Sequence, residues 1–318
     1  MTDPPYGIGF QNERWDGRAI QEAAARTGHA RLSRSNAYQA WCRAWGHECV
    51  RVLKPGGYLL AFGSPRTAHR LAAGLEDAGL ELRDTLLWLY GTGMPKSRRL
   101  PGGRGTTLKP AYEPILLARR PPGASIARTM ERHGTGALNV DACRVEGRYP
   151  ANVICSHAPG CRPDGCHAGC AVALVDTAAA EGRAPSNTTS PASRLFYCPK
   201  VSRRERDAGC EHLPRRALDL FPNAQDAGAA APARNPHPTV KPLALMRWLV
   251  RLATPEGGLV LDPFCGSGTT GAAAVLEGRG FLGAELDPAY AAIARARIEH
   301  WSGEGEHESD AVPFARSA

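Results

Sequence analysis

Apolar runs alternate with amphipathic stretches at both ends of the chain, and this alternation predicts an α/β fold. In the N-terminal part, helices are predicted over 39–52 and 66–78, and short buried strands over 58–62 and 82–89. Strands that are separated by helices usually lie side by side in parallel. We therefore expect a parallel sheet with helices packed against it.

The same alternation returns in the C-terminal part of the chain. Helices are predicted over 242–253, 269–277 and 288–301, and strands over 259–261 and 281–285. The chain has 318 residues, which suffices for one large domain with a sizeable insertion.

The middle of the chain lacks this pattern. It is rich in arginine, glycine, proline and alanine, and it holds a cluster of cysteines and histidines. We interpret it as an irregular insertion. The expected organisation is two α/β segments at 1–120 and 236–301, the insertion at 121–235, and a disordered polar tail at 302–318.

The composition disfavours two classes of protein and suggests a charged partner. No apolar run reaches the roughly 18–20 residues of a membrane span, and no signal-peptide pattern is present. We therefore expect a cytoplasmic protein without a membrane partner. The formal net charge is +8 and the pI is about 9.1, which suits a polyanion such as a nucleic acid.

A glycine-containing loop follows the predicted strand 259–261 and opens the predicted helix that begins at Thr269. Gly266 and Gly268 let a ligand approach the backbone closely, and the N-terminus of the helix offers unpaired N–H groups. Glu285 ends the next strand about twenty residues later, where a carboxylate can accept hydrogen bonds from ribose hydroxyls. The spacing predicts a site for a nucleoside cofactor. The alternative is a tight strand-to-helix turn without a ligand.

A second element, Asp3-Pro4-Pro5-Tyr6, lies at the start of the chain. Its two prolines stiffen a loop that presents a carboxylate, a carbonyl and an aromatic ring to one space. Asp3 and the Pro4 carbonyl can accept the two hydrogens of a planar amine while Tyr6 stacks on its ring. The alternative is a proline-rich turn without a ligand.

Together, these two elements resemble the amino-group DNA methyltransferases. The order, with Asp-Pro-Pro-Tyr first and Asp-Pro-Phe-x-Gly-Ser-Gly-Thr-Thr last, is similar to the β-type members. The resemblance implies a Rossmann-like methyltransferase fold, S-adenosyl-L-methionine as cofactor and double-stranded DNA as substrate. Further segments resemble motifs of phage and bacterial members: 91–97, 109–114, 134–139, 196–200 and 235–242.

The resemblance also implies a role for each segment and motif. The first segment becomes the catalytic half, the insertion the target-recognition region, and the last segment the cofactor-binding half. The residues implied to receive a base flipped out of the duplex are Asp3, Pro4, Pro5 and Tyr6. Those implied to bind the cofactor are Asp262, Phe264, Gly266, Gly268 and Thr269, with Glu285 at the ribose and Thr239 and Lys241 near the methionine end. Basic residues that would contact phosphate are Arg98, Arg99, Arg104, Arg119, Arg120, Arg203, Arg204 and Arg206.

The base that accepts the methyl group follows only from a correlation within the family. Asp at the first motif position accompanies N6-adenine methylation more often, whereas Ser is more usual in N4-cytosine enzymes, so Asp3 favours adenine. N4-cytosine stays open because both amines present the same two hydrogens. Methylation of an amine or amide in protein or RNA is disfavoured, since such sites more often begin with Asn.

The start of the chain departs from the family pattern. Members have an apolar strand directly before the catalytic motif, whereas this chain begins Met1-Thr2, so we expect that strand to be missing. A DNA-binding relative without catalysis is therefore a further alternative. The partners that the family context suggests are a cognate restriction endonuclease and a second copy of the chain in a homodimer.

The cysteine and histidine cluster points to a metal. His157 and Cys161 are separated by three residues, as are Cys166 and Cys170. Four such ligands can close a tetrahedral structural zinc site, which would help to order a segment with little core. The alternative is free thiols beside surface histidines, and disulfides are the least favoured in a cytosolic chain. Substitute ligands are Cys155, His167, Cys198, Cys210 and His212.

Overall fold

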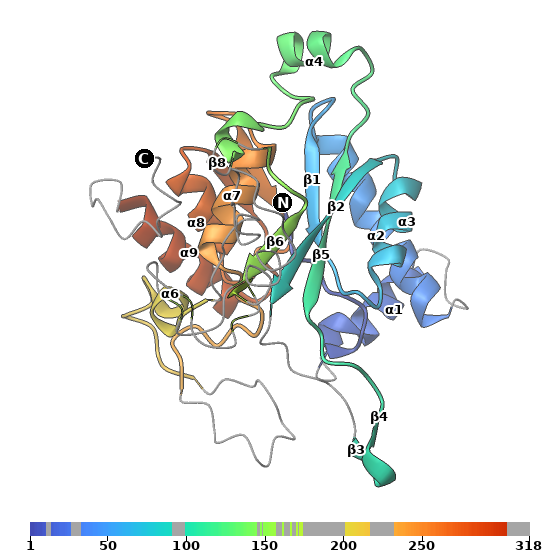
Figure 1. Ribbon diagram of the computed structural model, residues 1–318, viewed down its shortest axis with the longest axis vertical. Coiled ribbons are helices and arrows are strands. Elements are labelled where there is room, and N and C mark those ends of the chain that lie inside the picture. The colour runs from blue at the N-terminus through green and yellow to red at the C-terminus, as the bar shows by residue number, and fades with distance from the viewer. Residues whose placement is uncertain are drawn as a thin grey trace, which may run out of the picture.

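The computed structural model has a central sheet with helices on either side of it (Figure 1). It describes residues 1–10, 14–26, 33–90, 99–144, 147, 149–156, 161, 166, 170, 172–173, 201–216 and 232–303. The strands are β1 (Tyr58–Phe62), β2 (Glu81–Tyr90), β3 (Arg99–Leu100), β4 (Arg104–Gly105), β5 (Tyr112–Arg119), β6 (Val153–Ser156), β7 (Leu259–Asp262) and β8 (Gly280–Gly283). The helices are α1 (Arg18–Ala24), α2 (Arg34–Val52), α3 (Ala68–Asp77), α4 (Ile126–His133), α6 (Arg203–Asp207), α7 (Leu243–Ala253), α8 (Thr269–Leu276) and α9 (Pro288–Gly303), with short 3-10 helices at Arg14–Asp16, Pro101–Gly103 and Asp141–Cys143.

The largest sheet has the strand order β1-β5-β2-β6 and is mixed rather than parallel. Strand β5 runs antiparallel to both of its neighbours, while β2 and β6 are parallel. The expected α/β fold with parallel strands is confirmed, and the antiparallel strand β5 was not expected. The reason is that β5 is the next strand of this sheet after β2 and pairs back onto it, with Leu89 opposite Tyr112, which needs no crossover helix.

Two residues at the start of the chain link this sheet to the parallel pair β7 and β8. Thr2 forms a parallel bridge with Ala61 of β1, and the Met1 nitrogen donates a hydrogen bond of 2.8 Å to the carbonyl of Leu261 in β7. Met1 and Thr2 thus occupy a strand position between β1 and β7. The expectation that nothing stands in this position is wrong for these two residues.

Helices α1–α3 lie on one side of the sheet and α7–α9 on the other (Figure 1). Helix α2 begins at Arg34, earlier than the predicted start, because the Ser33 hydroxyl caps it by accepting a hydrogen bond from the Asn36 N–H. Helix α7 follows Pro242 as predicted and buries Leu245 and Leu249 in the core. Within the described residues, none of the helices has both the length and the apolar character that crossing a membrane requires.

The middle of the chain contributes one strand to the main sheet. Strand β6 lies within 121–235 and pairs with β2 so that Tyr90 is opposite Ser156. A buried hydrogen bond of 2.7 Å from the Trp88 indole to the Ser156 hydroxyl fixes the end of this pairing. The division into catalytic half, insertion and cofactor half stays a prediction.

Candidate active site

The buried carboxylate of Asp262 holds the loop after β7 in place. Its Oδ1 accepts hydrogen bonds from the Thr2 hydroxyl at 2.6 Å and from the Phe264 N–H at 3.1 Å. Its Oδ2 accepts one from the Thr270 hydroxyl at 2.5 Å. Only 2% of Asp262 is exposed, so it shapes the loop through these three bonds.

Both glycines of the loop adopt left-handed backbone conformations, with φ of +52° at Gly266 and +78° at Gly268. A Cβ on Gly266 would lie 2.8 Å from Nε2 of His237, and one on Gly268 would lie 2.8 Å from the Cα of Ala294 in α9. The packing of the loop therefore requires glycine at both positions. Gly268 also caps α8, whose first N–H groups have no carbonyl partner within the helix; Thr269 is the first residue of that helix and is buried.

Glu285 lies beside this loop, just beyond the end of β8. Its Oε2 accepts a hydrogen bond of 2.7 Å from the Gly266 N–H, and its Oε1 accepts one of 2.9 Å from the Asp287 N–H. Each carboxylate oxygen retains a lone pair for a further donor. The residue is half-buried, so ribose hydroxyls are donors that fit this position. Open α/β sheets bind ligands at such carboxyl ends, where the strand order changes direction.

A third segment, 235–242, contacts the loop 263–268, which we call the cofactor loop after its predicted role. His237 lies against Gly266, and its Nδ1 accepts a hydrogen bond of 3.4 Å from the Thr239 N–H. Burial, and then the positive charge of Arg206, lower the pKa of His237 to about 3. The ring is therefore neutral at pH 7.

The same segment reaches the catalytic motif through Lys241. Its ammonium lies 3.1 Å from Asp3 Oδ2 and 2.7 Å from Glu113 Oε2, and it lies 3.1 Å from the Tyr6 hydroxyl. Tyr6 donates to Asp3 Oδ1 at 2.8 Å and lies within 3.2 Å of Glu113 Oε2, and Tyr90 donates to the other Glu113 oxygen at 3.3 Å. We call Asp3, Tyr6, Glu113 and Lys241 the catalytic cluster, after the role predicted for Asp3 and Tyr6.

The catalytic cluster holds two carboxylates and one ammonium in a mostly buried space. The side chains of Lys241, Asp3 and Glu113 are 8%, 19% and 20% exposed. Burial raises the pKa of Asp3 to about 6; the charge of Lys241 opposes this and that of Glu113 adds to it. Burial alone would lower the pKa of Lys241, but the two carboxylates outweigh it and raise that pKa above its ordinary value. The cluster therefore carries a net negative charge at neutral pH.

Side chains outside the predicted set hold the loop of the catalytic motif. The Thr67 hydroxyl donates a hydrogen bond of 2.7 Å to the Tyr6 carbonyl, and the buried Asp16 carboxylate accepts from the Gly7 N–H at 2.7 Å. Pro4 is buried and Pro5 is half-buried at the start of this loop. The motif is thus anchored on both sides.

An aromatic group packs over the cofactor loop from α2. The ring of Phe264 lies 5.5 Å from that of Trp41 and 5.6 Å from that of Trp45, measured between centroids. Tyr38, one turn earlier in α2, stacks on Trp41 at 6.0 Å. Phe264 is therefore held in place by two indole rings.

Some of the arginines predicted to contact phosphate serve the fold instead. Arg119 is 8% exposed and pairs with Glu81 at 2.7 Å. Arg206 donates a hydrogen bond of 2.7 Å to the His237 carbonyl. The predicted role of Arg119 is wrong because its guanidinium is buried and paired within the protein, whereas that of the half-buried Arg206 stays a prediction. Of the others, Arg98 lies outside the described residues, while Arg104, Arg203 and Arg204 are exposed.

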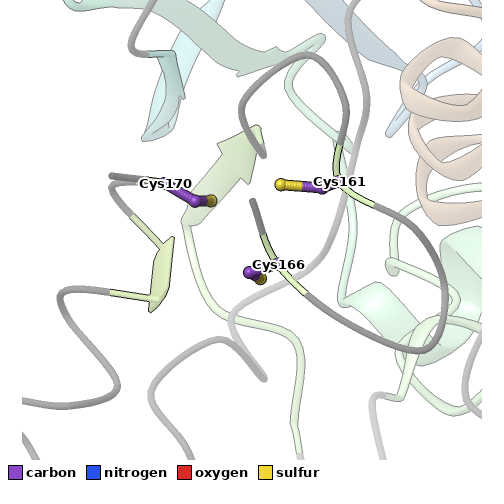
Figure 2. Close-up of side chains that lie close together, drawn as sticks. All are labelled: Cys161, Cys166 and Cys170. Atoms are coloured by element: carbon purple, nitrogen blue, oxygen red, sulfur yellow. The ribbon is translucent and has the colours of Figure 1, made fainter. Parts of the chain in front are cut away.

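Three of the four predicted metal ligands come together. The sulfurs of Cys161, Cys166 and Cys170 all lie within 4.8 Å of one another, and their side chains surround a common space (Figure 2). Cys170 is buried and Cys166 is exposed. The fourth predicted ligand, His157, lies outside the described residues, as do His167 and Cys198. The substitute ligands that the structure does describe, Cys155, Cys210 and His212, are not part of this group.

Sequence reasoning gave no role to Glu113 or His237, although both lie within segments that resemble family motifs. Glu113 is 128 residues from Lys241 in the chain, so no local pattern reveals their contact. A usable signal was the single carboxylate near the start of the apolar run of β5, where a strand otherwise buries its side chains.

Comparison with protein families matches residues 1–296 to the family N6_N4_Mtase, described as DNA methylase. The chain belongs to this DNA methylase family. Type II methyltransferase M.HindIII of Haemophilus influenzae is 25% identical over 283 residues, 83% of this chain and 70% of the relative. Type II methyltransferase M.HpaI of Haemophilus parainfluenzae is 24% identical over 300 residues, 94% of this chain and 67% of the relative.

A solved structure confirms the fold of this DNA methylase. PvuII DNA methyltransferase (cytosine-N4-specific) matches with a TM-score of 0.54 and 15% sequence identity, over 99% of this chain and 80% of that chain. The relationship predicted from the two sequence motifs and the predicted methyltransferase fold are both confirmed.

Proposed function

We propose that this DNA methylase transfers a methyl group from S-adenosylmethionine to the N6 amine of an adenine flipped out of duplex DNA. One observation carries the proposal, the 2.6 Å hydrogen bond between Thr2 and Asp262. It joins the residue before Asp3 to the carboxylate that shapes the cofactor loop, so the two predicted sites lie side by side. Membership of the DNA methylase family supports the reaction class.

The cofactor side of the site fits a nucleoside with a charged tail. S-adenosylmethionine, when bound, supplies an electrophilic methyl group on its sulfonium. The N–H groups at the start of α8 and the carboxylate of Glu285 would hold polar groups of the nucleoside, and Phe264 offers an aromatic surface. Thr239 donates a hydrogen bond to His237, which lies against the same loop. The predicted contact of Lys241 with the methionine end stays a prediction, since its ammonium faces Asp3 and Glu113.

The catalytic cluster fits an amine that becomes positively charged as it reacts. The lone pair of an exocyclic amine is delocalised into its ring, so the nitrogen is a weak nucleophile. Hydrogen bonds from its two hydrogens to Asp3 and to the Pro4 carbonyl would favour a pyramidal nitrogen with an available lone pair. The net negative charge of the cluster would stabilise the positive charge that develops. The excess proton can then pass to Asp3, whose pKa is about 6.

Lys241 and Glu113 act on Asp3 as positioning residues in this scheme. Lys241 holds Oδ2 of Asp3 in place and limits the rise of its pKa, and Tyr6 holds Oδ1. Glu113 in turn fixes both Lys241 and Tyr6. The carboxylate is thus oriented before a base arrives, so little reorganisation is needed during the reaction.

Adenine is the proposed base because Asp stands at the first position of the catalytic motif. N4-cytosine is the second candidate, and the cytosine-N4 specificity of the PvuII enzyme favours it. The names of the two Type II relatives support a role in restriction and modification beside a cognate endonuclease. A homodimer stays a prediction.

Duplex DNA would contact an exposed basic hairpin. Strands β3 and β4 form an antiparallel pair that extends away from the body of the protein (Figure 1), and its Arg104 is exposed. Phosphate contacts from such a hairpin set the register of the protein on DNA without specifying its sequence.

We also propose that zinc binds to Cys161, Cys166 and Cys170, with His157 as the predicted fourth ligand. Zinc–sulfur bonds of about 2.3 Å in a tetrahedron place the sulfurs about 3.8 Å apart, and the three sulfurs lie within 4.8 Å of one another. Elemental analysis of protein purified without chelators should find one zinc per chain. A content well below one would end this part of the proposal.

The methyl transfer is tested with methyl-labelled S-adenosylmethionine and unmethylated duplex DNA. After digestion to nucleosides, mass spectrometry should find the label in N6-methyladenine. Label in N4-methylcytosine would keep the mechanism but overturn the base. Asp3→Ala should abolish transfer while cofactor binding persists. Binding of cofactor and DNA without any transfer by the unaltered protein would replace the proposal with a catalytically silent DNA-binding relative.

A further inference from the structure

The cysteine cluster begins five residues after β6, and the end of β6 is hydrogen-bonded to Trp88, which lies near the catalytic cluster. Strand β6 ends at Ser156, and Cys161 comes five residues later. The Ser156 hydroxyl accepts the buried 2.7 Å hydrogen bond from the Trp88 indole. The Trp88 ring lies 5.9 Å from the Lys241 ammonium, measured to its centroid, and 5.2 Å from the ring of Tyr90. A chain of contacts thus runs from Ser156, five residues before Cys161, through Trp88 to the catalytic ammonium.

Strand β6 buries Ile154 in the core but lies at an edge of the sheet. It has four residues and, among the strands that the structure describes, it pairs only with β2. A short edge strand exposes the backbone groups of its free side and frays easily. A cross-link that starts at Cys161, five residues after its last residue, would oppose that fraying.

We propose that a zinc ion on Cys161, Cys166 and Cys170 clamps the end of β6 and, through Ser156 and Trp88, holds the wall of the catalytic cluster beside Lys241. The inference rests on the proposed zinc site and the proposed methyl transfer. The zinc has a structural role and touches neither substrate nor cofactor. Trp88 and Ser156 are positioning residues.

A single metal ion accounts for this arrangement better than a disulfide does. A disulfide brings two sulfurs to about 2.05 Å and leaves the third thiol out. Zinc engages all three, whose sulfurs lie within 4.8 Å of one another. Cys170 is buried against the protein, so the metal would attach the segment to the core rather than to itself.

The first test measures the metal without reference to activity. Zinc content and the absorption spectrum of the Co²⁺-substituted protein report the number of thiolate ligands. Cys166→Ser should lose the zinc, and so should Cys161→Ser, whereas Cys143→Ala, a buried cysteine outside the cluster, should retain one equivalent. His157→Ala tests the fourth ligand in the same assay. Zinc absent from the unaltered protein, or a disulfide in its place, would overturn the inference.

The second test asks whether the metal acts through Ser156. Ser156→Ala should keep its zinc but lower kcat by up to about tenfold, with the KM for S-adenosylmethionine little changed. Cys166→Ser should lower kcat by a similar factor, and the double variant should fall no further than either single variant. Additive losses, or an unchanged kcat after zinc removal, would refute the clamp.

A spectroscopic signal separates failure of the clamp from failure of the proposed function. The indole N–H of Trp88, identified by its loss in Trp88→Phe, should shift in the NMR spectrum when zinc is removed. The shift should be absent in Ser156→Ala, where the connection is already broken. If no methyl transfer is found, the zinc content and the Trp88 indole signal still test the proposed clamp. An indole signal that does not shift when zinc is removed would refute it.

Discussion

Replacing Asp3 by Asn should stabilise the folded protein while it removes methyl transfer. The carboxylate of Asp3 is ionised at neutral pH in a space where burial raises its pKa from 3.8 to about 6. At about 1.4 kcal/mol for each unit of pKa, a difference of about two corresponds to about 3 kcal/mol of unfolding free energy that the ionised group costs. Asn has nearly the same shape and no charge, and Lys241 keeps its pairing with Glu113.

The gain should depend on pH in a way that follows from the raised pKa. Below pH 3.8, Asp3 is protonated in both the folded and the unfolded protein, so its ionisation makes no difference. Between pH 3.8 and about 6 the folded protein binds the proton more tightly, so the unaltered protein loses stability relative to Asp3→Asn as the pH rises. Above about pH 6 the difference should stay constant.

Urea unfolding of the two proteins between pH 4.5 and pH 8 measures this difference, with the same methyl-transfer assay on each. We expect the Asn variant to be more stable by up to about 3 kcal/mol at pH 8 and by less at pH 4.5. An Asn variant that is no more stable than the unaltered protein at pH 8 would show that burial of the ionised Asp3 does not cost unfolding free energy. A fall in the kcat/KM of the unaltered protein as the pH drops through about 6 is expected from the same pKa, because kcat/KM reports the ionisation of the free enzyme.

Three further predictions concern the cofactor loop and Lys241. Gly266→Ala should lose affinity for S-adenosylmethionine in calorimetry, because the new Cβ would lie 2.8 Å from the ring of His237. The control is Gly278→Ala, which also has a positive φ (+68°) but whose Cβ would have no atom within 4 Å, and it should bind normally. Lys241→Met should lower the unfolding free energy by roughly 3–5 kcal/mol at pH 8, because it leaves two buried carboxylates unpaired. The loss should be smaller below pH 6, where Asp3 takes up a proton. Equal losses at both pH values would contradict this. Glu285→Ala should weaken cofactor binding about tenfold, and unchanged affinity would refute its assignment to the ribose.

Local patterns predicted the helices and strands well because each depends on neighbours in the chain. The strand predicted at 58–62 has the bounds Tyr58–Phe62, and the helix predicted at 242–253 begins one residue later, at Leu243. Strand β5 was not predicted. Its antiparallel direction could not be predicted either, because sheet order depends on contacts between distant strands. Strand β6 was missed because its four residues are too few for a periodic signal.

The residues of the site were predicted better than the contacts between them. Asp3, Tyr6 and Lys241 were named from motifs, but nothing local indicated that Lys241 would face Asp3 across 238 positions of the chain. Glu113 was overlooked for the same reason. The motif indicated Asp262 as a pocket residue without revealing that three neighbouring groups occupy its oxygens.

The aromatic side chains of α2 touch both halves of the site. Tyr38 lies under the backbone of the catalytic loop, where a Cβ on Gly7 would come within 2.5 Å of its ring, and it stacks on Trp41, which packs against Phe264. Indole fluorescence is sensitive to small changes of this kind in its surroundings. The protein therefore carries its own chromophore at the junction of the two binding sites, and one emission signal can time the arrival of methyl donor and of flipped base in rapid mixing.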